Sequence, residues 1–200
     1  HVFRKFVGFS HYYGELHRPR NLRVLVRDLL QDERIKVWGL DIDVETFCRT
    51  LPACEMRDVI AHLFSLYARA VGKRRWGDKT PPHAFHLHQI TRFFPDARII
   101  HLVRDGRDVA VSSRRAFLGP SSIVALAQRW SQHVIACDAF QPHARPGTFL
   151  EVSYEQLAAH PEQVLSETLA FLGETPRAVG GDVPRTPLTR TYLARSGIHR

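Results

Sequence analysis

One stretch of the chain restricts its fold more than any other. Residues 98–113 read RIIHLVRDGRDVAVSS: an apolar run ends at Arg104, turns through Asp105 and Gly106, and restarts with a helical period. A short and nearly all-apolar run is typical of a strand covered on both faces, as in a parallel sheet. The stretch therefore predicts a buried strand, a tight turn and a helix.

Helical and strand patterns alternate along much of the remaining chain. Residues 74–82, RRWGDKTPP, indicate a strand end that runs into a loop, and residues 1–19 are rich in aromatic residues and histidine without a clear period. This alternation predicts an α/β fold with a parallel sheet and right-handed crossovers. We expect helices over 21–31, 56–72, 84–94, 109–117, 123–140 and 161–172, a short helix from Asp43 to about Thr50, a helix that begins at Tyr154, and a second strand over 148–152.

Composition narrows the class of protein. The chain has 200 residues, enough for one domain, and a formal net charge of +8. An anionic partner fits this charge, whether nucleotide, nucleic acid, acidic lipid or sulfated substrate, and so does a solvated basic surface. Three cysteines, Cys48, Cys54 and Cys137, form neither a disulfide framework nor a metal cluster, which favours a reducing, cytoplasmic compartment. No apolar run approaches the roughly 20 residues of a membrane span.

Three polar segments are predicted to reach one edge of the sheet. They are residues 77–80, 104–107 and 153–155, and ligands of open α/β sheets bind at the carboxyl ends of the strands. A loop that leads into a helix presents free N–H groups to an anion, and Arg104 adds a bidentate donor. Ser112, two turns into the helix, adds a hydroxyl. The alternative is a helix capped by Asp105 or Gly106 beside an exposed Arg104.

Several segments together resemble the sulfotransferases that use 3′-phosphoadenosine 5′-phosphosulfate (PAPS). The closest resemblance is to the bacterial branch, which is also similar to tyrosylprotein sulfotransferases. The match rests on several motifs in the right order and is tight over residues 75–174. The segments are WGDKTP at 76–81, FPDARIIHLVRDGRDVAVS at 94–112, Trp130 with His133, and FLEVSYEQLAAHPEQVLSETLAFLGE at 149–174.

The resemblance implies a fold and a reaction. The fold is a three-layer, P-loop-like α/β fold with a central parallel sheet flanked by helices. The reaction is transfer of the sulfuryl group from PAPS to a hydroxyl or amine, with 3′-phosphoadenosine 5′-phosphate (PAP) as the product. The residues present require no metal.

The resemblance also assigns roles to single residues. In the family, an Arg at the strand end and a Ser eight residues later bind the 3′-phosphate, and Arg104 and Ser112 have this spacing. Tyr154 matches the Tyr that lies against the adenine, and Lys79 matches the Lys that reaches the sulfate and the bridging oxygen. A fixed ammonium is useful there because negative charge builds on the leaving phosphate oxygen. Arg195, in the C-terminal ARSGIHR, is a further cofactor-binding candidate.

For two residues near these candidates we expect a structural role and not a role in binding the donor. Arg107 could join the 3′-phosphate site, but we expect it to form a surface salt bridge. Thr80 could orient the loop, but we expect it to cap the helix that follows Pro81 and Pro82.

The sequence departs from the family pattern at its ends. The Gly-rich loop that binds the 5′-phosphosulfate in relatives is absent from residues 1–67. We therefore expect residues 1–200 to form a single sulfotransferase domain that lacks its first strand-loop-helix and its C-terminal end.

The catalytic base is the second departure. Cytosolic relatives carry a His two residues after the loop Lys, where this chain has Pro81. The tyrosylprotein branch uses a Glu that would fall at or before His1. His83 is the base candidate within the chain, since histidine titrates near working pH, but we favour the missing Glu. His101 lies inside the predicted strand and is expected to be a hydrogen-bonded core histidine.

Two other functions compete with sulfuryl transfer. A P-loop nucleotide phosphotransferase would need a G-K-[ST] loop and Mg²⁺ ligands, which the sequence lacks. A non-catalytic nucleotide-binding module is compatible with the missing first loop. The acceptor is not readable from the sequence, although residues 1–72 are expected to line its site. No nucleic-acid partner is expected.

Overall fold

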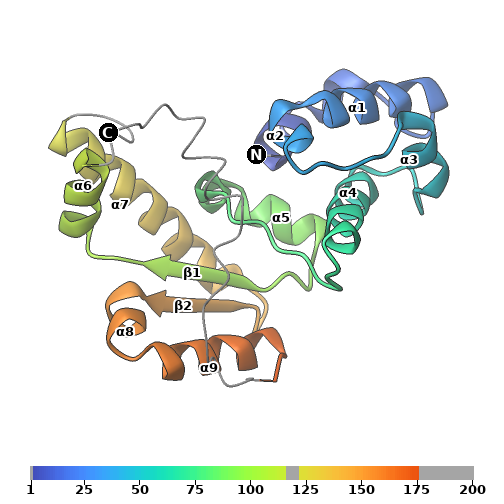
Figure 1. The fold of residues 1–200 in the computed structure, drawn as a ribbon. Helices are drawn as coiled ribbons and strands as arrows, with labels where there is room; N and C mark the ends of the chain where they lie inside the picture. The colour runs from blue at the N-terminus through green and yellow to red at the C-terminus, as the bar shows by residue number, and fades with distance from the viewer. Residues whose placement is uncertain (1, 116–121, 176–200) are drawn as a thin grey trace. The chain divides into compact units, whose positions relative to one another are not determined.

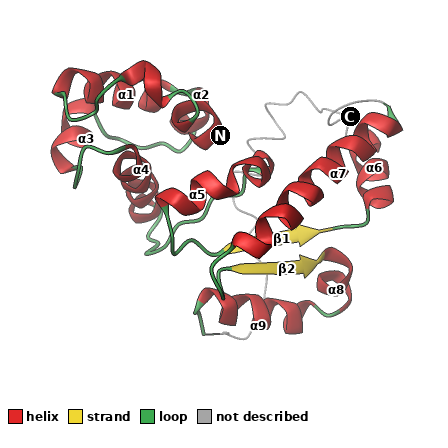
Figure 2. Ribbon diagram, turned by 180° about the vertical axis from the view of Figure 1, so that it is seen from behind, coloured by secondary structure: helices red, strands yellow, loops and turns green. Residues whose placement is uncertain are grey.

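The structure is a computed structural model that describes residues 2–115 and 122–175 (Figure 1). The chain divides into two compact units, His1–Glu151 and Val152–Arg200, and we describe each by itself. Helices dominate the described residues (Figure 2), and the sheet within them has two strands, β1 and β2. The elements, with η for a 3₁₀- or π-helical turn, are η1 (Phe3–Val7), η2 (Ser10–Tyr13), α1 (Pro19–Gln31), α2 (Glu33–Lys36), α3 (Val44–Thr50), α4 (Met56–Ala70), η3 (Pro81–His86), α5 (Leu87–Phe93), β1 (Ile99–Val103), α6 (Gly106–Arg115), α7 (Ile123–Phe140), η4 (Gln141–His143), β2 (Phe149–Ser153), α8 (Tyr154–Ala159) and α9 (Pro161–Leu172).

The predicted α/β class is confirmed by a small parallel sheet. Strands β1 and β2 are hydrogen-bonded neighbours, and their arrows point the same way in Figure 1. At the start of the pair, the Ile99 N–H donates to the Thr148 carbonyl over 2.8 Å. Helix α7 lies between the two strands in the chain, as the crossover connection of a parallel pair requires.

The prediction that β1 is covered on both faces is wrong for the described residues. Its side chains alternate between half-buried and exposed, and Ile100 and Leu102 are 40% and 52% exposed. The other face is covered because Ile99 packs against a cluster of Leu87, Cys137 and Phe140 from α5 and α7. The apolar run of β1 fits a strand covered on both faces, but only one of its faces is buried.

The N-terminal helices form the larger core. The π-helical turn η1 packs with α1, α3 and α4, and Phe6, Leu25, Phe47 and Leu63 are at most 1% exposed. The aromatic residues within 1–19 have no helical period because Phe3–Val7 folds as a π turn and Ser10–Tyr13 as a 3₁₀ turn, whose periods differ from 3.6. These aromatic side chains divide between two environments. Phe3 and Phe6 are core residues, whereas Phe9 and Tyr12 are exposed.

No strand forms between residues 73 and 80, which corrects the expectation for this segment. The indole of Trp76 stacks on Phe64 of α4, with ring centroids 4.8 Å apart and planes inclined by 16°. Aromatic packing therefore anchors this loop where a neighbouring strand was expected. Pro81 and Pro82 then begin the 3₁₀ turn η3, since they lack the N–H groups that a sheet needs.

Helix boundaries follow local capping rules in several places. Asp43 caps α3 through the Thr46 N–H at 2.8 Å, Ser122 caps α7, and Ser153 caps α8. Gly72 follows α4 with a φ of +67°, a conformation that glycine adopts without strain. Ser122 explains the start of the predicted 123–140 helix, and the predicted helices over 21–31 and 161–172 lie close to α1 and α9. Phe117, the predicted end of the 109–117 helix, lies outside the described residues.

None of the helices in the described part of the chain is long and apolar enough to cross a membrane. The three cysteines, Cys48, Cys54 and Cys137, are free thiols.

Candidate functional site

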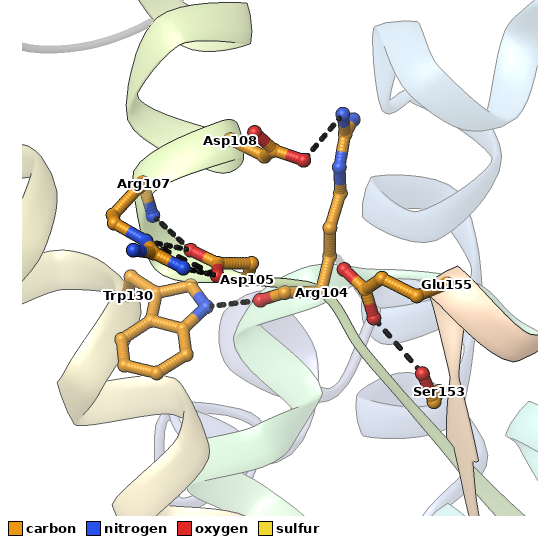
Figure 3. Close-up of polar contacts among 7 residues, drawn as sticks. All are labelled: Arg104, Asp105, Arg107, Asp108, Trp130, Ser153 and Glu155. Carbon is orange, nitrogen blue, oxygen red and sulfur yellow. Dashed lines mark hydrogen bonds and ion pairs between the residues drawn. The ribbon is translucent and has the colours of Figure 1, made fainter.

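The turn between β1 and α6 is built by its first two polar residues. Arg104 follows the last residue of β1, and the carboxylate of Asp105 accepts a hydrogen bond from the Arg107 N–H over 2.8 Å (Figure 3). This bond satisfies one of the N–H groups that helix α6 leaves open in its first turn. Asp105, one of the two caps named in the alternative interpretation of this turn, therefore caps α6.

Arg107 and Asp105 form an ion pair on the surface. The Arg107 guanidinium reaches the carboxylate with Nη2 at 2.6 Å and Nε at 3.0 and 3.2 Å, and its side chain is 91% exposed. Hydrogen bonds from the Arg107 side chain and backbone lower the pKa of Asp105 to about 2. The expected surface salt bridge of Arg107 is confirmed.

The Arg104 side chain points away from that pair. Its Nη2 lies 3.5 Å from the Asp108 carboxylate, one helical turn along α6, and 34% of the side chain is exposed (Figure 3). A contact of this length is a weak hydrogen bond at best. The Asp108 contact by itself therefore does not hold the guanidinium against an incoming anion.

Trp130 of α7 holds the backbone of the same turn. Its indole Nε1 donates to the Arg104 carbonyl over 2.9 Å (Figure 3). The ring also covers Gly106: a Cβ at that position would lie 2.9 Å from Trp130 Cδ2 and 3.1 Å from Cε3. Real Cβ atoms do not approach a ring so closely, so only glycine fits beneath the indole.

The loop before η3 forms a second polar cluster around Asp78. The Asp78 carboxylate accepts a hydrogen bond from the Thr80 hydroxyl over 2.8 Å, and its other oxygen lies 2.6 Å from His83 Nε2. Thr80 stands at the N-cap position of η3, but its hydroxyl bonds Asp78 and caps no backbone N–H, which corrects its predicted role. The neighbouring Lys79 is exposed.

The Asp78–His83 pair is sheltered from solvent. The two side chains are only 19% and 14% exposed, and the His83 ring meets Phe3 edge-on at 5.5 Å. Burial alone would raise the pKa of Asp78, but the hydrogen bond and charge of His83, with the Thr80 hydroxyl, outweigh burial and lower that pKa. A carboxylate bonded to Nε2 fixes the orientation of the imidazole and leaves Nδ1 as its other nitrogen. The sequence gives no hint of this pair, because its five-residue spacing acquires meaning only in the 3₁₀ turn.

Helix α7 contacts both polar clusters. Turn η3 packs on it through Phe85, whose ring meets that of His133 at 4.6 Å, and the β1–α6 turn is held by Trp130. Trp130 and His133 stand three residues apart, on one side of the helix. The structure therefore attaches the loop that carries Lys79 and His83, and the turn that carries Arg104, to the same helical turn of α7.

The remaining predicted residues lie elsewhere. Ser112 is exposed on α6, six residues beyond its first residue. Tyr154 is the first residue of α8 in the second unit, beside Ser153, whose hydroxyl donates to Glu155 over 2.9 Å (Figure 3). The tyrosine ring is 39% exposed. Arg195 lies outside the described residues.

These elements make an α/β protein in which a parallel strand ends at a basic turn and leads into a helix. A model of the sulfotransferase family matches residues 14–176, well over half of the chain. The chain belongs to the sulfotransferase family.

Two further comparisons concern the fold and the sequence separately. The sulfotransferase domain from the curacin biosynthetic pathway aligns with a TM-score of 0.50 and 21% identity, over 78% of this chain and 59% of that one. A protein of Aquifex aeolicus (strain VF5), described as uncharacterized, is 33% identical over 121 residues, which are 57% of this chain and 15% of that protein. The chain therefore spans only part of the length of either relative.

Proposed function

We propose that this protein transfers the sulfuryl group of PAPS to a hydroxyl or amine acceptor. Family membership supports sulfuryl transfer in general. The observation that carries the proposal is the attachment of two polar clusters to one turn of α7, by Trp130 and by the Phe85–His133 contact. The β1–α6 turn offers the guanidinium of Arg104 to bind the donor. The loop before η3 and η3 itself offer the ammonium of Lys79 and the imidazole of His83 for sulfuryl transfer.

Arg104 and Ser112 are proposed to bind the 3′-phosphate of the donor. A guanidinium matches two phosphate oxygens at once, and the long contact to Asp108 is a weak competitor. The positive end of the α6 dipole adds a favourable field at the same turn. Tyr154, an exposed ring at the start of α8, is proposed to stack on the adenine, and Arg195 is proposed as a further phosphate contact.

Lys79 is proposed to stabilise the charge that develops during transfer. As the bond between sulfur and the bridging oxygen breaks, negative charge accumulates on the oxygen that leaves with PAP. An ammonium placed there stabilises the transition state more than the ground state. Pro81 and the Asp78–Thr80 hydrogen bond restrict the loop, and this restriction reduces the cost of placing Lys79.

His83 is proposed as the base within this chain, with Asp78 as its positioning residue. The acceptor forms a new bond to sulfur while its proton passes to the imidazole Nδ1, and the bridging S–O bond breaks. Asp78 at 2.6 Å stabilises the resulting imidazolium, as carboxylates do in other His–Asp pairs. The family resemblance also offers a Glu that would fall at or before His1. The His83→Ala variant described below tests whether His83 is the base.

The donor is tested by calorimetric titration with PAP and, separately, with ATP. Arg104→Ala should weaken PAP binding by about 10- to 100-fold, the loss expected for a charge-assisted bidentate contact. Arg107→Ala is the matched control, because its guanidinium is already paired with Asp105 and should leave PAP affinity unchanged. Equal binding of PAP by Arg104→Ala and the parent protein would overturn the assignment. Tighter binding of ATP than of PAP would favour a nucleotide phosphotransferase. Binding of PAP without any turnover would favour a non-catalytic nucleotide-binding module.

We also propose a reducing, cytoplasmic environment for this protein. Three free thiols support it, of which Cys54 is exposed and would be open to oxidation elsewhere.

A further inference from the structure

We propose that His101, Asp138 and Glu151 form a binding site for one divalent transition-metal ion, with Zn²⁺ as the best match. The three come from different elements of the first unit: His101 from β1, Asp138 from α7 and Glu151 from β2. Their potential ligand atoms all lie within 4.8 Å of one another. The site is separate from the proposed sulfotransferase residues and does not rest on them.

The state of His101 is the first argument. Its side chain is only 11% exposed, and its Nδ1 is buried without a hydrogen-bond partner. Nδ1 nevertheless lies 3.3 Å from a Glu151 carboxylate oxygen, in a geometry that makes no hydrogen bond. The expectation of a hydrogen-bonded core histidine is therefore wrong at this nitrogen. A cation bound to both atoms would satisfy this buried nitrogen.

Charge is the second argument. Asp138 and Glu151 bring two carboxylates to the same point, where their mutual repulsion is unfavourable. A divalent cation with one neutral imidazole and two carboxylates gives a site of zero net charge. Both carboxylates are on exposed residues, so an ion can enter from solvent and keep water as its remaining ligand.

The ligand set selects the metal. Imidazole nitrogen and carboxylate oxygen are both ordinary zinc ligands, at about 2.0–2.2 Å. Mg²⁺ and Ca²⁺ prefer sites made only of oxygen, and a thiolate-dependent ion would need a sulfur that this set lacks. Three protein ligands and a water complete a tetrahedron, which suits Zn²⁺ and its spectroscopic substitute Co²⁺.

The neighbours of the site hold its ligands in place. The His101 ring packs at 6.1 Å from Phe149, the first residue of β2, and α7 is fixed nearby by the buried Cys137 and Phe140. A metal here would therefore link both strands to the helix that connects them. Such a link stabilises the folded state, because the unfolded chain does not hold the ligands together.

The test uses the protein carrying this sequence, freed of metal by a chelator. Titration with Co²⁺ should give visible d–d absorption bands that saturate at one ion per chain, and Zn²⁺ should displace it. Zn²⁺ should also raise the melting temperature. Asp138→Asn and Glu151→Gln, which keep the side-chain shape at exposed positions, should each weaken Co²⁺ binding at least 10-fold. Glu162→Gln on α9 is the matched control and should change nothing.

A stricter variant removes the imidazole. His101→Gln should abolish the d–d bands. Its circular dichroism spectrum shows whether the variant folds. If it does not fold, Co²⁺ binding by Asp138→Asn and Glu151→Gln tests the proposal instead. Absence of saturable Co²⁺ binding would overturn the proposal. So would unchanged binding in both carboxylate variants, since the ion would then sit on other histidines of this chain.

Discussion

The indole N–H of Trp130 donates to the carbonyl oxygen of Arg104 across 26 positions of sequence, over 2.9 Å. The bond ties the middle of α7 to the residue at which β1 ends. The same ring closes over Gly106. The direction in which Arg104 leaves the strand is therefore set by a residue on a different element, and the first prediction follows from this contact.

Gly106→Ala should destabilise the fold by about 1–3 kcal/mol, the usual cost of overpacking. The added methyl would meet Trp130 Cδ2 at 2.9 Å, and the ring cannot move without losing its bond to Arg104. Chemical denaturation measures the loss, and Trp130→Leu in the same chain should recover part of it. Gly77→Ala is the control, since a Cβ there meets nothing within 4 Å. Additive effects of the two substitutions would show that the ring does not confine Gly106.

Lys79→Ala should reduce turnover by about 10²–10³-fold, the effect of removing one preorganised group from a developing oxyanion. PAP affinity should change far less, because the contact strengthens mainly in the transition state. Steady-state kinetics measure the effect on turnover, and titration with PAP measures the effect on affinity. Lys73→Ala removes an exposed ammonium from the same stretch and should leave both unchanged. Full turnover in Lys79→Ala would remove Lys79 from the mechanism.

Asp78→Asn should lower kcat by about 10²-fold or more while the KM for the donor stays nearly constant. The amide can no longer balance a positive charge on His83, 2.6 Å away. Asp78→Glu should restore part of the activity, and a purely structural role would predict similar losses from both variants. His83→Ala is the companion test. If it turns over like the parent protein, His83 is not the base, and Asp78 positions no catalytic group.

The free energy of unfolding should fall as the pH drops below about 6.5, the ordinary pKa of histidine. His62 is 8% exposed, and burial, with the nearby charge of Arg69, lowers its pKa. The unfolded chain therefore binds a proton before the folded one does, and acid favours unfolding. His62→Gln, which can still bond the Thr50 hydroxyl, should flatten the dependence between pH 7.5 and 5.5, whereas His17→Gln at an exposed position should not. Equal slopes in the parent protein and His62→Gln would contradict this cause.

Local sequence signals were sufficient to predict an element whose ends are set by residues close to it in the sequence. The caps Asp43 and Ser122 and the glycine after α4 mark helix ends through bonds within a few residues, so those boundaries were predictable. The strand over 99–103 was equally clear. The signals failed for residues 1–19 and 73–80, because a π turn and a loop held by Trp76 stacking have no period to detect.

The sequence by itself determined the α/β class, the strand-turn-helix at residues 98–113 and the resemblance to sulfotransferases, because each is carried by neighbouring residues. Only the tertiary structure decided that Asp78 meets His83, that Trp130 closes over Gly106, and that Asp138 and Glu151 converge on His101. For Trp130 and for the residues around His101 the physical reason is distance along the chain, whereas Asp78 and His83 are five residues apart and meet only because a 3₁₀ turn forms between them. Such contacts depend on how separate elements pack, and no local pattern encodes which side chains the packing will bring within a few ångströms.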